Sequence, residues 1–184
     1  MDTITIANRP IGPGHPSFII AELSANHNHD LARAKRIVEA AADAGADAIK
    51  LQTYTADTLT FDSDSAEFRV DGTIWEGKTL YQLYQEASLP WAWHKPLMDH
   101  ARNLGLLAFS TPFDATAIEF LESLDVPAYK IASSELVDIP LIRRVAGLGK
   151  PMIISTGMGT LSEIDEAVQT ARAAGCDQII LLKC

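Results

Sequence analysis

One layout recurs along this chain. A stretch with helical periodicity ends at a breaker, and a short apolar run follows it. The breakers are Gly45, Gly105, Asp125, Gly149 and Gly175, and glycine is the residue expected just past a helix end. With the opening run included, six candidate strands result: 18–23, 47–52, 106–110, 126–131, 151–155 and 178–183. Strands that alternate with helices pair in parallel through right-handed crossovers, so the layout predicts an α/β fold, either an open doubly wound sheet or a (β/α)8 barrel.

Capping residues mark where the intervening helices begin. Asp30 precedes a helical apolar face, and Thr160 has the spacing of a capping box with the glutamate three residues later. Asp114 and Asp138 are candidate N-caps for two more helices. Residues 1–16 are rich in glycine and proline, and they are predicted to form a short β-hairpin or cap before the first unit.

The length of the chain limits the barrel. A complete eight-unit barrel takes about 250 residues, whereas the sequence has 184 and ends with a sixth strand. We therefore expect a TIM (β/α)8 barrel truncated after about six βα units, with residues 1–184 forming the N-terminal part of the barrel domain. Six strands cannot close a barrel, so the first and sixth strands would keep unpaired edges unless another chain or segment covers them.

Composition excludes several classes of protein. There are 24 acidic and 15 basic side chains, and a net charge of −9 argues against a nucleic-acid partner. Hydrophobic residues make up 47% of the chain and charged residues 21%, which favours a folded core over disorder. The two cysteines lack a C-x-x-C spacing, and no apolar run approaches the roughly 18 residues that cross a bilayer. We expect a soluble, cytoplasmic protein without membrane contact.

Charged side chains interrupt the strands that should be buried. The alternation of side chains along a strand points Lys50, Lys130 and Glu22 toward the barrel axis. A buried, unpaired ammonium costs several kcal/mol, and one glutamate cannot neutralise two lysines, so this pattern predicts a small anionic ligand. The alternative is that the lysines lie on the outer face and pair with surface acids such as Asp47 or Glu135.

Small hydroxyl side chains gather near the same strand ends. They are Ser110, Thr111, Ser133, Ser134, Ser155 and Thr156. Hydroxyl groups are suitable donors to carboxylate or phosphate oxygens, and the carboxyl ends of the strands carry the chemistry in barrel enzymes. These strand ends therefore predict a site that attracts an anionic substrate through local charge, despite the negative charge of the whole chain.

A long insertion separates Thr53 from a predicted helix over residues 80–87. A segment of this length in a compact domain is usually a lid or a recognition element. Its mixture of aromatic and hydrogen-bonding side chains suits a sugar, which offers apolar ring faces and many hydroxyl groups. The alternative is a disordered surface excursion.

The histidines have several interpretations. His27 and His29 follow the first strand, and we favour loop hydrogen bonding by His27 and a solvent-facing His29 over metal ligation, because a third ligand is missing. His94 and His100 lie in a predicted helix, where packing or surface roles are expected.

Five stretches together resemble the sialic acid synthase family, whose members condense phosphoenolpyruvate with an N-acylated amino sugar. The stretches are Ile20–His27, Ala44–Thr53, Ser110–Phe113, Ala128–Ser133 and Gly149–Met158. Within that family, four stretches look more like pseudaminic acid synthases than N-acetylneuraminate synthases. They are Glu22–His27, Tyr54–Asp57, Leu80–Tyr84 and Leu182–Cys184.

The resemblance implies features outside these residues as well as roles within them. It implies a C-terminal antifreeze-like domain that is swapped in a homodimer, and a divalent metal, Mn or Mg, held by two histidines late in the barrel. No metal ligand is therefore expected in this chain. By the same resemblance, phosphoenolpyruvate would contact Lys50, Thr111, Lys130, Ser133 and Ser155, while Glu22, Lys50 and Gln52 would be catalytic and Phe113 would shape the pocket.

Several functions stay open. The first is the pseudaminic acid synthase type, which uses phosphoenolpyruvate and a 2,4-diacetamido-2,4,6-trideoxy hexose. An N-acetylneuraminate or legionaminate synthase would perform the same reaction on another sugar. An alternative that is not an enzyme is an inactive partial barrel that serves as a binding or assembly module. A further alternative is an aldolase-like barrel, which would use a Schiff-base lysine. The 184-residue chain by itself is expected to have little or no activity.

Overall fold

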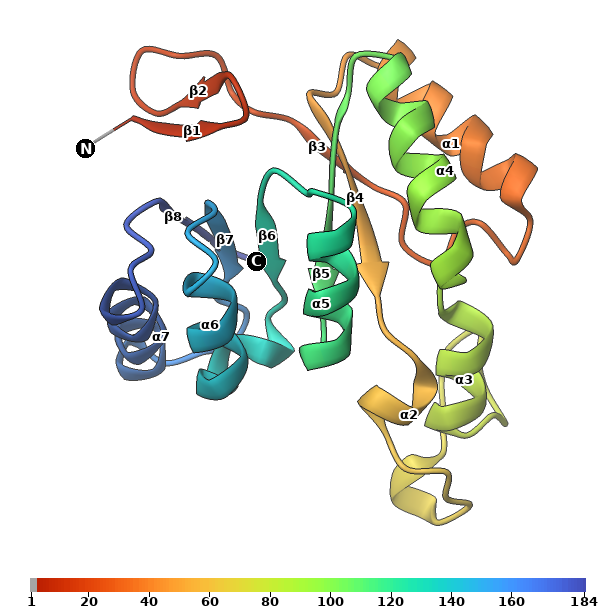
Figure 1. Cartoon of the computed structure of the whole chain (residues 1–184). Helices are drawn as coiled ribbons and strands as arrows, with labels where there is room; N and C mark the ends of the chain where they lie inside the picture. Colours follow the sequence, from red (N-terminus) through yellow and green to blue (C-terminus); the bar gives the residue numbers. More distant parts are fainter. Residues whose placement is uncertain (1–2) are drawn as a thin grey trace.

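The computed structural model describes residues 3–184, which form an α/β fold on one parallel sheet (Figure 1). Its six strands are β3 (Ile20–Glu22), β4 (Ala48–Thr53), β5 (Leu107–Pro112), β6 (Tyr129–Ile131), β7 (Met152–Ser155) and β8 (Ile179–Leu182). The strands lie in sequence order and every neighbouring pair is parallel. The six predicted strands and their parallel pairing are confirmed.

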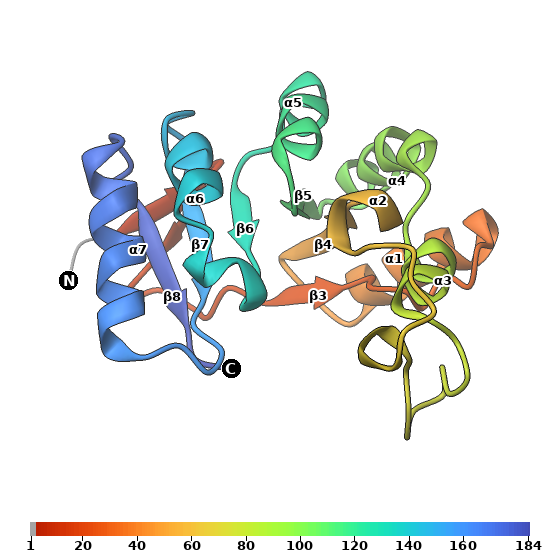
Figure 2. The same cartoon turned by 90° about the horizontal axis from the view of Figure 1, so that it is seen from below.

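Helices cover one face of this sheet. They are α1 (Leu31–Asp43), α4 (Trp91–Asn103), α5 (Ala115–Ser123), α6 (Ile139–Ala146), α7 (Leu161–Ala173) and the short helix η2 (Ser134–Val137). Figure 2 shows that the sheet curves, with the helices on its outer side. Within the described residues, β3 and β8 each pair on one side only. The sheet is therefore an open half-barrel with a concave inner face.

The two middle strands of this half-barrel share little pairing. Only Ser110 of β5 and Tyr129 of β6 are paired in register, whereas β4 and β5 share six such pairs. The β5–β6 seam therefore has the fewest paired residues in the sheet.

The predicted helix starts are confirmed by their hydrogen bonds. The Asp30 carboxylate accepts from the backbone N–H of Arg33 at 3.0 Å. Asp114 and Asp138 cap α5 and α6 in the same way, and Thr160 forms a capping box at the start of α7. Each cap satisfies N–H groups that a helix start leaves without a partner.

A β-hairpin lies at the amino ends of the strands (Figure 1). It consists of β1 (Ile4–Ile6) and β2 (Arg9–Ile11), which pair antiparallel. The Thr5 N–H donates to Gln178 at 3.1 Å, and the Arg9 guanidinium lies 3.3 Å from Asp47. The predicted hairpin is thus present in the described residues; residues 1 and 2 lie outside them.

The insertion after β4 is folded. It contains α2 (Ala56–Leu59) and a short helix η1 (Ala66–Phe68), and it leads into α3 (Leu80–Ala87). Arg69 and Thr79 form an antiparallel bridge, and the Tyr81 hydroxyl donates to Asp57 at 2.8 Å. The segment lies beyond the carboxyl end of β4 (Figure 1). The alternative of a disordered excursion is therefore wrong.

None of the helices formed by residues 3–184 is long and apolar enough to cross a membrane.

Candidate active site

Side chains on the strands alternate between the helix layer and the inner face. The Thr53 hydroxyl contacts His94 of α4, and the Tyr129 hydroxyl donates to Glu122 of α5 at 2.6 Å. Because neighbouring residues on a strand point to opposite faces, Gln52 and Lys130 face the concave side. The inward orientation predicted from alternation is therefore confirmed.

Lys50 is buried at the inner face and pairs with the predicted glutamate. Its side-chain nitrogen lies 3.2 Å from a carboxylate oxygen of Glu22, which is its register partner on β3. The carboxylate of Asp47 instead binds Arg9 and the backbone N–H of Ile19. The alternative in which Lys50 pairs on the outer face with Asp47 is therefore wrong.

Lys130 is also buried, with 5% of its surface exposed. Its ammonium donates to the backbone carbonyl of Ile131 at 2.8 Å and to the hydroxyl of Ser155 at 2.5 Å. Both partners are neutral, and no carboxylate among residues 3–184 forms an ion pair with it. Burial, followed by the nearby charge of Lys50, lowers the pKa of Lys130 to about 8. The inner face therefore holds two ammonium groups and one paired carboxylate.

Thr111 lies next to Lys130 on the inner face. Thr111 of β5 is the register partner of Gln52 on β4. Ser110 of β5 is the register partner of Tyr129 on β6, so the residues that follow these two, Thr111 and Lys130, are neighbours on the sheet. The hydroxyl of Thr111 is buried and finds no hydrogen-bond partner among the described residues. An unsatisfied buried polar group costs about 1–3 kcal/mol. A ligand oxygen at this point would satisfy the hydroxyl and approach the ammonium of Lys130.

Two loops meet at Ser133. A Cβ on Gly157 would lie 2.6 Å from the Cβ of Ser133, so only glycine allows this approach. The Ser133 hydroxyl lies 3.5 Å from the sulfur of Cys184. Hydrogen bonds from Ser133 and Ser155 lower the pKa of the Cys184 thiol to about 7. The sequence analysis missed Cys184, although it stands directly beyond the sixth strand.

Phe113 lies at the side of the site nearest the insertion. Its ring packs edge-on against Tyr54 at a centroid distance of 5.3 Å, and Tyr54 packs against Tyr84 of α3 at 5.9 Å. Burial raises the pKa of Tyr54 to about 12, so this phenol stays neutral. The aromatic cluster joins the end of β5 to the insertion.

Ser110 does not face the site. Its hydroxyl lies 2.7 Å from that of Thr53, which lies 2.8 Å from the Nε2 of His94, and all three are buried under α4. Burial lowers the pKa of His94 to about 4, so the ring is neutral. The alternation that turns Thr111 inward could have shown that Ser110 points outward. The Ser134 hydroxyl donates to the neighbouring Glu135, and the Thr156 hydroxyl donates to the backbone carbonyl of Leu182 on β8.

The other histidines behave as packing and loop residues. His27 is fully buried, and its Nδ1 accepts from the backbone N–H of His29, which is itself exposed. Burial is the main cause that lowers the pKa of His27. His100 lies 2.9 Å from Glu39 at the surface. The hydrogen-bonding role of His27 is confirmed. Within residues 3–184, no three His, Cys, Asp or Glu side chains cluster as metal ligands would.

Comparison with known proteins identifies the family of this chain. The sequence profile described as the NeuB family matches residues 37–184. The chain belongs to the NeuB family. Among NeuB-like relatives, pseudaminic acid synthase of Helicobacter pylori is 48% identical over 169 residues, which are 92% of this chain and 50% of that protein.

A further relative and a solved structure have other names. N,N'-diacetyllegionaminic acid synthase of Legionella pneumophila is 39% identical over 96% of this chain and 51% of its own length. The crystal structure of N-acetylneuraminic acid synthetase from Leptospira borgpetersenii, in complex with citrate, superposes with a TM-score of 0.86. That structure is 32% identical, and the match covers 100% of this chain and 59% of the other. The chain spans about half the length of the curated NeuB relatives it matches.

Proposed function

We propose that this NeuB chain belongs to an enzyme that condenses phosphoenolpyruvate with an N-acetylated amino sugar to give a nonulosonic acid and phosphate. The observation that carries this proposal is the pair of buried ammonium groups of Lys50 and Lys130, of which only Lys50 has a carboxylate partner, Glu22. The names of the family relatives, which include synthases of pseudaminic and legionaminic acids, support the same reaction class.

The site residues suit the two acidic groups of phosphoenolpyruvate. The ammonium groups of Lys50 and Lys130 offset the charge of its carboxylate and phosphate, and the hydroxyls of Thr111, Ser133 and Ser155 donate to the remaining oxygens. The unpartnered hydroxyl of Thr111 is ready for such a contact. Fixing the trianion at several points orients its methylene carbon toward the second substrate.

The proposed reaction forms one carbon–carbon bond and breaks one carbon–oxygen bond. Carbon 3 of the enol attacks the open-chain aldehyde of the sugar, and the aldehyde oxygen takes a proton. Carbon 2 becomes an oxocarbenium ion, a water molecule adds to it, and phosphate leaves as the keto group forms. Glu22 is more than half exposed and 3.2 Å from Lys50, so its carboxylate can stabilise the cation or accept a proton from water. Gln52 borders the same centre.

Other parts of the proposal concern the longer protein that the family relatives indicate. We propose that it completes the TIM barrel, works as a homodimer in the cytoplasm, and binds Mn or Mg. Because residues 3–184 show no cluster of ligands for such an ion, we derive no step of the reaction through it. The domain and cofactor assignments stay predictions.

The sugar is proposed to be a 2,4-diacetamido-2,4,6-trideoxy hexose, as for the pseudaminic acid synthase type. The relative with this name is 48% identical and the legionaminic acid synthase 39%. An N-acetylneuraminate or legionaminate synthase remains the second candidate, since the reaction is the same.

A phosphate-release assay tests the proposal. The complete gene product, incubated with phosphoenolpyruvate and the diacetamido sugar, is expected to release phosphate and form a nonulosonic acid. Activity with N-acetylmannosamine alone would contradict the choice of sugar. If no sugar gives phosphate, the chain is a binding or assembly module. Borohydride trapping of a carbonyl substrate on a lysine would instead support the aldolase alternative.

A further inference from the structure

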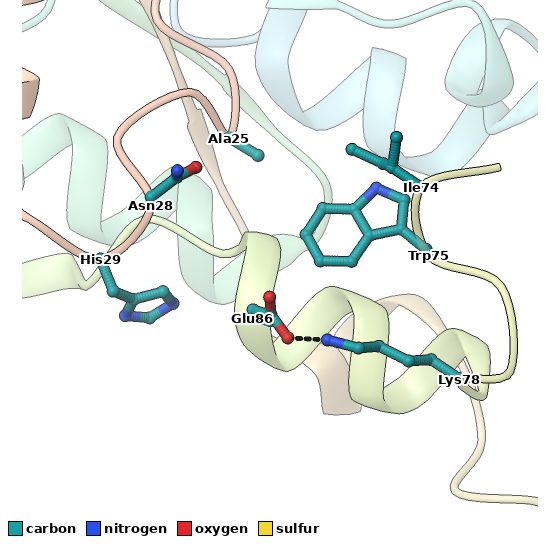
Figure 3. A pocket seen from close by; sticks show the side chains of 7 residues that line it. All are labelled: Ala25, Asn28, His29, Ile74, Trp75, Lys78 and Glu86. Atoms are coloured by element: carbon teal, nitrogen blue, oxygen red, sulfur yellow. Dashed lines mark hydrogen bonds and ion pairs between the residues drawn. The ribbon is translucent and has the colours of Figure 1, made fainter.

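A cavity lies near the strand-end site and is lined by none of the residues assigned to that site. It has a volume of about 370 Å³, near the lower end of the range for small-molecule pockets. Figure 3 shows that its lining comes from three segments. These are the loop after β3 (Ala25, His29), the insertion (Ile74, Trp75, Lys78) and helix α3 (Glu86).

The cavity is close to the proposed reacting centre. Ala25 follows Glu22 by three residues, so the two Cα atoms are at most ~11 Å apart. Ala25 lines the cavity, and Glu22 contacts Lys50 in the anion site. A substituted six-carbon sugar with its aldehyde at the reacting centre can therefore place its far end in the cavity.

The charges in the cavity cancel. The Lys78 ammonium forms an ion pair with Glu86 and lies 5.1 Å from the centre of the Trp75 ring (Figure 3). In the strand-end site, by contrast, there are two buried ammonium groups and only that of Lys50 is paired with a carboxylate. The cavity is therefore suited to an uncharged ligand, and phosphoenolpyruvate belongs in the other site.

Beside the ion pair, the cavity is lined by two polar side chains, Asn28 and His29, and by the apolar side chains of Ile74 and Trp75. The Ile74 side chain is 93% exposed, and the Trp75 ring stands next to it across the opening (Figure 3). Large apolar side chains at a pocket favour ligands with apolar faces or methyl groups. The Lys78–Glu86 ion pair beside them can also bind an amide group of the same ligand.

We propose that this cavity binds the far end of the sugar and selects a sugar that carries an acylamino group and a deoxygenated terminal carbon. The identity of the ligand rests on the proposed condensation. Lys78 donates to the amide carbonyl, Glu86 accepts from the amide N–H, and Trp75 with Ile74 contacts the methyl groups. A hydroxyl on the terminal carbon loses the apolar contact with Trp75 and Ile74.

Calorimetry on the complete gene product tests this proposal with two sugars, the 2,4-diacetamido-2,4,6-trideoxy hexose and N-acetylmannosamine. The variants are Trp75→Ala and Lys78→Met. Phe61→Ala is the control for the first, because Phe61 lies in the same insertion, is 78% exposed and does not line the cavity. Lys95→Met is the control for the second, because Lys95 forms an exposed ion pair with Asp99.

Each variant of a cavity residue should weaken binding of the diacetamido sugar about tenfold or more, which is the size of effect expected for lost apolar contacts. Binding of N-acetylmannosamine should change less, and binding of phosphoenolpyruvate should stay the same, as it should in both controls. Equal losses for the two sugars would overturn the proposal. So would unchanged binding in Trp75→Ala, or no binding of the diacetamido sugar to the unaltered protein. Selective sugar binding without phosphate release would support the cavity and contradict the condensation.

Discussion

At the scale of single residues, Lys130 shows a conflict between folding and function. Its ordinary pKa of 10.5 falls to about 8 because burial disfavours the charged form. Between these two values the unfolded chain binds more protons, so the folded state gains stability as the pH rises from about 8 toward 10.5. At neutral pH the charge of Lys130 therefore costs folding stability. That cost is understandable if the ammonium serves an anionic ligand.

The variant Lys130→Met tests this interpretation. Methionine has a similar volume and no charge to bury, so the free energy of unfolding at pH 7 should fall by no more than about 1 kcal/mol, the net worth of a typical hydrogen bond. Binding of phosphoenolpyruvate, measured by calorimetry, should be lost. In the unaltered protein, that binding should weaken as the pH rises above about 8, where the ammonium loses its proton.

Lys95→Met is the matched control for this variant, because Lys95 is an exposed lysine of α4. It should bind phosphoenolpyruvate normally. Full binding by Lys130→Met would remove Lys130 from the anion site.

At the scale of elements, the contact between the loops after β6 and β7 depends on Gly157. Its φ of +49° is unfavourable for other residues, and an added Cβ would collide with Ser133. The variant Gly157→Ala should therefore displace Ser133 and weaken phosphoenolpyruvate binding as measured by calorimetry. Gly149→Ala is the control, because Gly149 has a φ of +70° but no atom within 4 Å of the added Cβ. It should lose stability in urea unfolding without losing affinity. The prediction fails if both variants bind equally well.

Local signals in the sequence were sufficient for most elements. Breakers, caps and alternation give the six strands, the helix starts and the inward direction of Lys50 and Lys130. The path of the insertion was not predictable, because it depends on tertiary contacts such as the Arg69–Thr79 bridge and the bond from Tyr81 to Asp57.

Polar residues in buried positions limited the prediction of the site. Ser110 belongs to a second polar layer under α4, where its hydroxyl bonds that of Thr53, which in turn bonds His94. The residue types at the end of β5, Ser110, Thr111 and Pro112, do not indicate this layer. Only the alternation of side chains along the strand separates the outward Ser110 from the inward Thr111. The family resemblance supplied the roles of Gln52 and Phe113, which their own surroundings do not specify.

At the scale of the whole molecule, the half-barrel has two open edges. Ile19 precedes β3 and is 52% exposed, and Leu181 and Leu182 of β8 are 46% and 36% exposed. Unpaired strand edges with exposed apolar side chains favour association with other chains.

A protein made of these 184 residues alone is therefore expected to self-associate. Light scattering after size-exclusion chromatography should show species larger than a monomer whose proportion rises with concentration. The complete gene product is the comparison, and its edges should be covered in a defined assembly. A 184-residue chain that stays monomeric and binds no apolar dye would contradict this expectation.

The limited pairing between β5 and β6 has a consequence for the proposed anion site. Lys50 stands on β4, on one side of the seam, and Lys130 stands on β6, on the other. An anion bound by both lysines would link the part of the sheet that contains β4 to the part that contains β6. Binding of the proposed anion should therefore make the sheet more rigid, because it would join strands on both sides of this seam.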